Sequence, residues 1–345
     1  MSLHPSGFQP PQWLRSPHLQ SILSSSPLRA RRARLRLHAE RARHTPMVLE
    51  VGDGVRLQGV HSAPANGVPH ALALLLHGWE GSVDSNYMRL TAARLLGAGF
   101  AVFRLNFRDH GDSHDLNEGL FHSNRIDEVV RAACRVAAQW PQMPLFAAGY
   151  SLGGNFALRL ALRAPEAGLP LQRVAAICPV LDPARTMAQM EAGLPIYLRY
   201  FEHKWRRSLA RKRALFPHAH GFGDDVLKLR MRALTEWMVL RHTDFATLDE
   251  YFEGYSVAGN RLRALQVPAD VLMAEDDPVI PAQEFTDIAG FPHLHVEMAP
   301  HGGHCGFIET AALDGYAERW VVERLSTACE PARVHTAANL HGDPA

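Results

Sequence analysis

The segment Gly149-Tyr150-Ser151-Leu152-Gly153 has the residue types and spacing of a serine nucleophile held in a tight turn. The apolar residues 144–148 before it predict a buried strand, and residues 154–162 after it predict an apolar helix. A strand that turns directly into a helix strains the backbone at the serine, and the glycines two residues away leave room for the turn. Five residues can match by chance, but the flanking strand and helix favour a nucleophile.

A serine nucleophile needs a base and an acidic group that orients the base. In one common arrangement the three occur along the chain in the order serine, acid, histidine. Residues 269–274 predict a strand, and acidic residues follow its end. We predict Asp277 as the orienting acid, because Pro278 and Pro281 would rigidify the turn after it. A purely structural alternative is that these acids cap the next helix. The other candidate acids are Asp276 and Asp182.

The base is expected on the loop after the last predicted strand, residues 293–298. That loop contains Gly302-Gly303-His304, and paired glycines let a loop double back toward both the carboxylate and the hydroxyl. The chain has 20 histidines, so a single histidine elsewhere would carry little information. We predict His304 as the general base, with His301 as the alternative.

Acyl transfer also needs hydrogen-bond donors for the oxyanion that develops in the transition state. The backbone N–H of Leu152, directly after the serine, is the first predicted donor. The second is the backbone N–H of Trp79, because Gly78 lets the loop after residues 71–76 turn toward the serine.

Composition predicts a globular protein with a large core, since 47% of the 345 residues are hydrophobic and 21% are charged. A net charge of +1 does not favour nucleic acid as a partner. The four cysteines are widely spaced, the first residues do not resemble a secretion signal, and no apolar run reaches the ~20 residues of a membrane span. We therefore expect a cytoplasmic protein that is not inserted in a membrane.

Strands and helices alternate along most of the chain, which predicts a mainly parallel sheet covered by helices on both faces. Gly52-Asp53-Gly54 between two apolar runs predicts an antiparallel hairpin at one edge. Residues 183–266 contain only helical patterns and predict an inserted helical cap. The expected organisation is an arm at 1–45, a core at 46–182 and 267–328, this cap, and a flexible tail at 329–345.

Arginine is dense between Arg29 and Arg43, and residues 1–28 are predicted to be irregular. The arginines could form a patch for acidic lipid or nucleic acid. We favour an edge strand whose charged positions face water, because no aromatic residues alternate with the arginines.

Taken together, these segments resemble the α/β-hydrolases, and more narrowly the YheT-like hydrolases, which are related to the eukaryotic ABHD acylglycerol lipases and phospholipases. The narrower resemblance rests on Pro17-His18-Leu19-Gln20-Ser21, on the loop from His77 to Ser82, and on the elbow, acid and histidine segments. It implies an α/β-hydrolase fold with a cap, hydrolysis of carboxylic esters including lipid-like or medium-chain acyl esters, and no cofactor or metal. It also implies Ser151, Asp277 and His304 as the catalytic triad.

Two segments depart from this resemblance. Residues 106–111, Asn-Phe-Arg-Asp-His-Gly, stand where the branch usually has Asn-x-Arg-Gly-Cys, and residues 121–124 also differ. His122 and Asp127 fit a His-x4-Asp pattern associated with acyl transfer, although Asp127 could simply complement a helix dipole. The alternatives to ester hydrolysis are an acyltransferase, a peptidase, and a non-catalytic protein that contacts a membrane surface.

Overall fold

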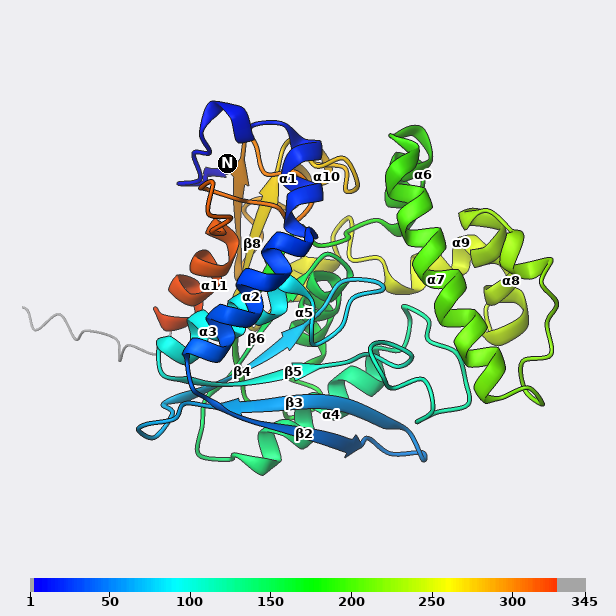
Figure 1. The fold of residues 1–345 in the computed structure, drawn as a ribbon, viewed down its shortest axis with the longest axis horizontal. Helices are drawn as coiled ribbons and strands as arrows, with labels where there is room; N and C mark the ends of the chain where they lie inside the picture. The colour runs from blue at the N-terminus through cyan, green and yellow to red at the C-terminus, as the bar shows by residue number, and fades with distance from the viewer. Residues whose placement is uncertain (1–2, 328–345) are drawn as a thin grey trace, which may run out of the picture.

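The computed structural model describes residues 3–327, so the predicted tail at 329–345 lies outside the described residues. A nine-stranded sheet runs through the molecule in the order β1-β9-β8-β7-β6-β4-β5-β3-β2 (Figure 1). The strands from β4 to β9 pair in parallel, as the alternation of strands and helices predicted. Their bounds are β4 Ala71–Leu76, β5 Phe100–Leu105, β6 Leu145–Tyr150, β7 Leu171–Ile177, β8 Ala269–Ala274 and β9 Leu294–Ala299.

The central strands form because their residues are apolar on both sides of the chain. Every residue of β4, β5, β6 and β8 is buried, which is the pattern of a parallel sheet with both faces covered. The helix α3 packs against α11 and against α2 (Pro27–Ala39), whereas α4 packs against α5. These helices are α3 Asn86–Gly97, α4 Ile126–Gln139, α5 Leu152–Arg163 and α11 Tyr316–Ser326.

The predicted hairpin is present at one edge of the sheet. Strand β2 (Arg43–Glu50) pairs antiparallel with β3 (Arg56–Ala63), and β3 pairs antiparallel with β5. At the opposite edge the two-residue strand β1 (His4–Pro5) pairs in parallel with β9. The first described residues are therefore attached to the last strand of the sheet.

Four helices and two short 3-10 helices occupy the segment between β7 and β8, and no strand lies among these described residues. They project to one side of the sheet, beyond the ends of its strands (Figure 1). The helix α7 is the longest of them. The four helices are α6 Pro183–Ala192, α7 Pro195–Leu215, α8 Met231–His242 and α9 Leu248–Tyr255. A short helix, α10 (Glu284–Ile288), follows β8.

The N-terminal region corrects two predictions. Residues 1–28 are not irregular throughout, because they include a 3-10 helix at Gln12–Leu14 and the helix α1 (Pro17–Ser24). The predicted edge strand between Arg29 and Arg43 is wrong, because a helix, α2 (Pro27–Ala39), occupies most of it.

Local chemistry explains why helices form there. The side chains of Ser16 and Ser26 accept hydrogen bonds from backbone N–H groups in the first turns of α1 and α2, and a proline follows each serine at the first helical position. Arginine, alanine and leucine, which fill α2, are strong helix formers. Within residues 3–327, every helix is too short or too polar to cross a lipid bilayer.

Candidate functional site

Ser151 occupies the sharp turn between β6 and α5, with a positive φ of 55°. A Cβ atom on Gly149 would lie 2.0 Å from the Gly153 carbonyl oxygen, and one on Gly153 would lie 2.3 Å from the Leu76 carbonyl oxygen. Both positions therefore exclude any residue larger than glycine. The turn has the strained geometry of a nucleophile elbow, and it presents the serine at the end of the sheet.

A continuous hydrogen-bonded chain links the serine to a buried carboxylate. The Ser151 Oγ lies 2.9 Å from His304 Nε2, and His304 Nδ1 lies 2.9 Å from Asp277 Oδ2. The other Asp277 oxygen accepts hydrogen bonds from the backbone N–H groups of Val279 and Ile280, at 2.7 and 3.0 Å. These two bonds fix the carboxylate that faces the imidazole. Asp277 does not cap the next helix, because α10 begins at Glu284 and no side chain caps its first turn.

The alternative candidates, Asp276, His301 and Asp182, form hydrogen bonds elsewhere and do not contact Ser151. Asp276 accepts from the Gly303 N–H at 2.9 Å and lies 3.4 Å from His301 Nδ1, so this pair supports the histidine loop without contacting Ser151. Asp182 caps α6 by accepting from the N–H groups of its first turn.

Charge and burial act in opposite directions on the pKa of His304. Burial lowers it, but the Asp277 carboxylate and the neighbouring Cys305 thiol raise it, and the resulting pKa is about 9. The imidazolium that forms when the base takes a proton from Ser151 is therefore stabilised by Asp277.

The loop after β4 leaves one backbone donor free. The N–H of Gly78 donates to the Tyr87 hydroxyl, that of Glu80 donates to His110 Nε2, and that of Gly81 donates to the Gly78 carbonyl. Among the described residues, neither the Trp79 N–H nor the Leu152 N–H has an acceptor. The two predicted oxyanion donors thus remain available for a ligand.

Two buried, neutral histidines hold this loop in place. Burial lowers the pKa of His77 to about 4 and that of His110 well below its usual value. His77 donates through Nδ1 to the Gly78 carbonyl at 2.8 Å and accepts from the Phe107 N–H at 3.2 Å. His110 is one of the residues that depart from the family pattern, and its contact with the Glu80 N–H gives that departure a structural role.

The helix α7 holds the same loop from the other side. Lys204 Nζ donates to the Glu80 carbonyl oxygen, and the Trp79 ring stacks on Phe201 at 5.4 Å and meets Trp205 edge-on at 5.3 Å. Sequence reasoning did not find Lys204, because its partner is a backbone atom 124 residues away.

The N-terminal helix α1 contributes residues that were noted only as part of a resemblance. Ser21 Oγ accepts a hydrogen bond from the His304 N–H at 2.8 Å. The Gln20 side chain, which is fully buried, accepts from the Ile308 N–H and donates to the Ile308 carbonyl. The His-Leu-Gln-Ser segment therefore supports the histidine loop from outside the core.

Two buried thiols lie beside the base. Cys178 and Cys305 together with His304 offer three potential metal ligands within 4.8 Å of one another. Because both nitrogens of His304 already face Asp277 and Ser151, these contacts describe thiols packed against the base.

His122 and Asp127 are not brought together. Asp127 forms an ion pair with Arg163 at 3.1 Å, and its carboxylate is mostly exposed, whereas the His122 ring packs near Tyr251. The interpretation of Asp127 as a residue at a helix start is the one that its position supports.

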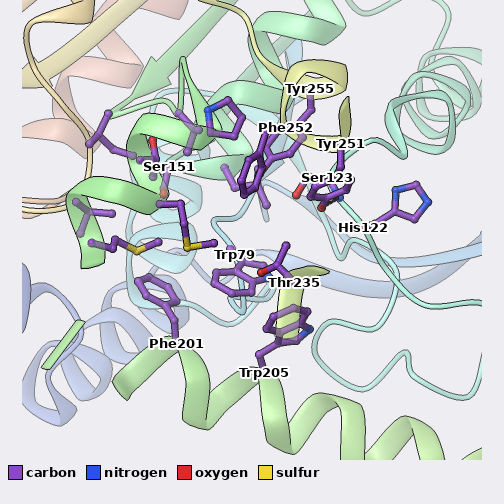
Figure 2. A pocket seen from close by; sticks show the side chains of 18 of the residues that line it. Trp79, His122, Ser123, Ser151, Phe201, Trp205, Thr235, Tyr251, Phe252 and Tyr255 are labelled. Atoms are coloured by element: carbon purple, nitrogen blue, oxygen red, sulfur yellow. Dashed lines mark hydrogen bonds between the residues drawn. The ribbon is translucent and has the colours of Figure 1, made fainter. Parts of the chain in front are cut away.

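An apolar cavity of about 90 Å³ begins at Ser151 and extends beneath the inserted helices (Figure 2). Aromatic rings and thioethers form most of its wall. Residues from α6 to α9 supply one side, and the loop around Trp79 and residues 121–123 supplies another. The side chains supplied by α6, α8 and α9 include Met187, Met190, Thr235, Met238, Phe252 and Tyr255.

A mostly parallel sheet, with a strained serine turn between a central strand and its helix, defines the α/β-hydrolase fold. The chain belongs to the family described as serine aminopeptidase, S33, whose model matches residues 67–311.

Individual relatives agree with this class. The chain is 25% identical over 330 residues to YheT of Escherichia coli (strain K12), named as a candidate esterase, covering 92% of this chain and 91% of that one. It is 25% identical to the human protein ABHD15, covering 91% of this chain and 67% of that one. The Pyrococcus furiosus esterase Pf2001 has the same fold, with a TM-score of 0.55, 16% identity, and coverage of 84% and 91%.

Proposed function

We propose that the protein is a serine hydrolase that cleaves carboxylic esters through an acyl-enzyme intermediate. The observation that carries the proposal is the hydrogen-bonded chain from Asp277 through His304 to Ser151. The names of YheT and of the similar solved structures, which describe esterases, support the same chemistry.

In the first step His304 Nε2 removes the Ser151 proton as Oγ attacks the ester carbonyl carbon. Asp277 holds the imidazole in the tautomer that leaves Nε2 free to accept, and it stabilises the cation that forms. The backbone N–H groups of Leu152 and Trp79 would donate to the oxyanion.

The imidazolium then gives its proton to the leaving alcohol oxygen, and the carbon–oxygen bond breaks. In the second step His304 removes a proton from water as the water oxygen attacks the acyl carbon. The bond between that carbon and Ser151 Oγ then breaks, the imidazolium returns its proton to Oγ, and the acid leaves. Side chains and backbone groups of this chain carry each of these steps. We also propose that the inserted helices, residues 183–266, form a cap over the site.

A peptidase remains the second candidate, because the family description names an aminopeptidase. An aminopeptidase must hold a free α-ammonium group, which calls for a carboxylate beside the scissile bond. Among the described residues, no aspartate or glutamate lines the apolar cavity. The one acid that lines the adjoining hollow at Ser151 is Glu80, and burial raises its pKa to about 8, so it is largely neutral at pH 7. This favours an ester over an amino-terminal peptide.

The proposal is tested with an alkyl fluorophosphonate, which labels activated serines. Wild-type protein should be labelled and should hydrolyse a nitrophenyl ester, and Ser151→Ala should abolish both. Ser326→Ala serves as the control, because Ser326 lies at the end of α11 and its side chain forms no hydrogen bond within residues 3–327. Labelling that survives Ser151→Ala would overturn the assignment.

A further inference from the structure

A second and larger hollow, of about 530 Å³, meets the first one at Ser151. It lies between the N-terminal segment 21–27, the loop of residues 78–81, the first half of α7 and the histidine loop. We call it the outer chamber, and the 90 Å³ hollow the inner cavity. The two share only four lining residues, which are Trp79, Ser151, Phe201 and Val279.

His304 distinguishes the two hollows. It lines the outer chamber, together with Cys305, but it does not line the inner cavity. Leu152, whose N–H is a proposed oxyanion donor, lines the inner cavity and does not line the outer chamber.

The chemistry of ester cleavage assigns a part of the substrate to each hollow. The leaving oxygen must lie within hydrogen-bond reach of His304 Nε2, because that atom gives it a proton. The water that attacks the acyl-enzyme must be near the same atom. The alcohol therefore departs through the outer chamber, water enters there after it, and the acyl chain must point into the inner cavity.

We propose that the substrate is an ester of a small apolar acid with a bulky alcohol that carries hydrogen-bonding groups, the acid side in the inner cavity and the alcohol in the outer chamber. The inference rests on the proposed function and specifies its substrate class.

The inner cavity limits the size of the acid. An apolar cavity of about 150 Å³ holds benzene in another protein, so about 90 Å³ suits an acyl chain of only a few carbons. Its wall consists largely of aromatic rings and thioethers, such as those of Met187, Met238 and Phe252. Among the described residues that line it there is no aspartate, glutamate, lysine or arginine. Such a lining stabilises an apolar chain and disfavours a charged one.

The outer chamber suits a larger and more polar group. Its apolar surfaces include the exposed side chains of Ile22, Ile196 and Tyr200. Its polar wall includes several hydroxyls and the Lys204 ammonium group. Of the three hydrogens of that group, one is donated to the Glu80 carbonyl and a second to the Tyr200 hydroxyl at 3.4 Å. Burial raises the pKa of Glu80 to about 8, so this acid is largely neutral at pH 7 and leaves Lys204 as the dominant charge.

Two substrate series test the assignment on the full chain. One series varies the acyl chain from acetyl to decanoyl on a single alcohol, nitrophenol, and the other varies the alcohol from methanol to an aryl glycoside on a single butyryl group. Wild type should prefer acyl chains of two to about four carbons, and its kcat/KM should increase with the size of the alcohol.

Paired variants then separate the two hollows. Met238→Ala should move the preferred acyl chain to a greater length and leave the ratio between large and small alcohols unchanged. Tyr200→Ala should lower kcat/KM for bulky alcohols about tenfold, while the acyl preference and the rate of deacylation stay as in wild type. Thr235→Ala and Ile196→Ala repeat the two tests at positions where truncation removes less buried surface.

The outcomes are distinguishable. A preference of wild type for decanoyl esters, or variants of the outer chamber that change acyl preference, would overturn the assignment while Ser151-dependent hydrolysis persists. So would variants that change neither preference. Absence of any hydrolysis or fluorophosphonate labelling that depends on Ser151 would instead reject the proposed function itself.

Discussion

The backbone N–H of His304 donates to the side chain of Ser21, at 2.8 Å, across 283 residues of sequence. Ser21 in turn donates from its hydroxyl to the Pro17 carbonyl of its own helix. The loop that carries the proposed base is therefore fastened to α1, a helix outside the central core.

Replacing Ser21 by alanine should loosen that loop. The His304 N–H would lose its acceptor, and we expect a loss of about 1 kcal/mol in the free energy of unfolding together with a several-fold fall in kcat. Chemical denaturation and steady-state kinetics measure the two effects. Ser326→Ala, which removes no side-chain hydrogen bond within residues 3–327, should change neither. Wild-type kcat in Ser21→Ala would show that the contact is only structural.

The pH dependence of hydrolysis should follow the protonation of His304. Its pKa is raised to about 9, so the neutral imidazole becomes more abundant as pH rises, and kcat/KM should rise with pH up to about 9. Asp277→Asn removes the negative charge that raises the pKa of His304. The rise of kcat/KM on the acid side of the pH profile (the acid limb) should therefore move to lower pH, while kcat falls by about 10⁴-fold.

Asp276→Asn is the matched control for this measurement. Its carboxylate contacts His301 and Gly303, so the acid limb should remain where wild type has it. A limb that moves equally in both variants would contradict the pairing of Asp277 with the base.

Lys204 is predicted to act on the oxyanion loop through the Glu80 carbonyl. Lys204→Met should reduce the rates of acylation and deacylation alike, by about tenfold, because the oxyanion forms in both steps. This is less than the roughly 10²–10³-fold loss of kcat that removal of a direct oxyanion donor causes, because Lys204 acts only through the loop. Pre-steady-state kinetics with a nitrophenyl ester resolve the two rates. Lys228→Met, which removes an exposed ammonium group, serves as the control. A wild-type rate of deacylation in Lys204→Met would contradict this role and would show that Lys204 acts only through contacts with the alcohol part of the substrate.

The elbow glycines should be intolerant of any side chain. A Cβ on Gly149 would meet the backbone of Gly153, which cannot move aside, so we expect Gly149→Ala to destabilise the protein by about 3 kcal/mol and to abolish activity. At Gly221, φ is not positive and the nearest atom to an added Cβ lies 3.8 Å away. Gly221→Ala should therefore leave the melting temperature within a degree or two of wild type. Equal stability of the two variants would contradict the close approach.

Asp109 forms a buried ion pair with Lys212 of α7 at 2.7 Å, and it stands where the related branch usually has glycine. Asp109→Asn should destabilise the protein by about 3–5 kcal/mol, because it removes the opposing charge and leaves the buried ammonium group with only the His114 and Asn117 carbonyls as charge-free acceptors. Asp109→Asn combined with Lys212→Met should recover part of that loss. Thermal unfolding of the single and double variants measures the coupling, and strictly additive effects would contradict it.

The sheet and the proposed catalytic residues were predictable because their signals are local. The strand Ala71–Leu76 is apolar throughout, and the elbow, acid and histidine segments each follow a strand that can be recognised by itself. The order in which they occur along the chain then predicted that they meet.

The N-terminal region was not predictable in the same way. Alternating arginine and leucine around Arg34 is also typical of an edge strand, although Ser26-Pro27 is a helix start signal and the residues favour a helix. The buried pair between Arg29 and Glu318, at 2.6 Å, stabilises α2 against α11 and joins segments 289 residues apart. No pattern within a short window contains that information.

The attachment of β1 to β9 also has a consequence for synthesis of the protein. The ribosome synthesises His4 at a point 293 residues before its partner in the sheet, Glu297. At about 5–20 residues per second that interval is roughly 15 to 60 seconds. The elbow and the inserted helices can form during this time, whereas α1 can dock only once the histidine loop exists. The segment that carries β1 and α1 is therefore made well before the elements against which it docks, and the nascent chain should gain hydrolytic activity only after the histidine loop has been synthesised.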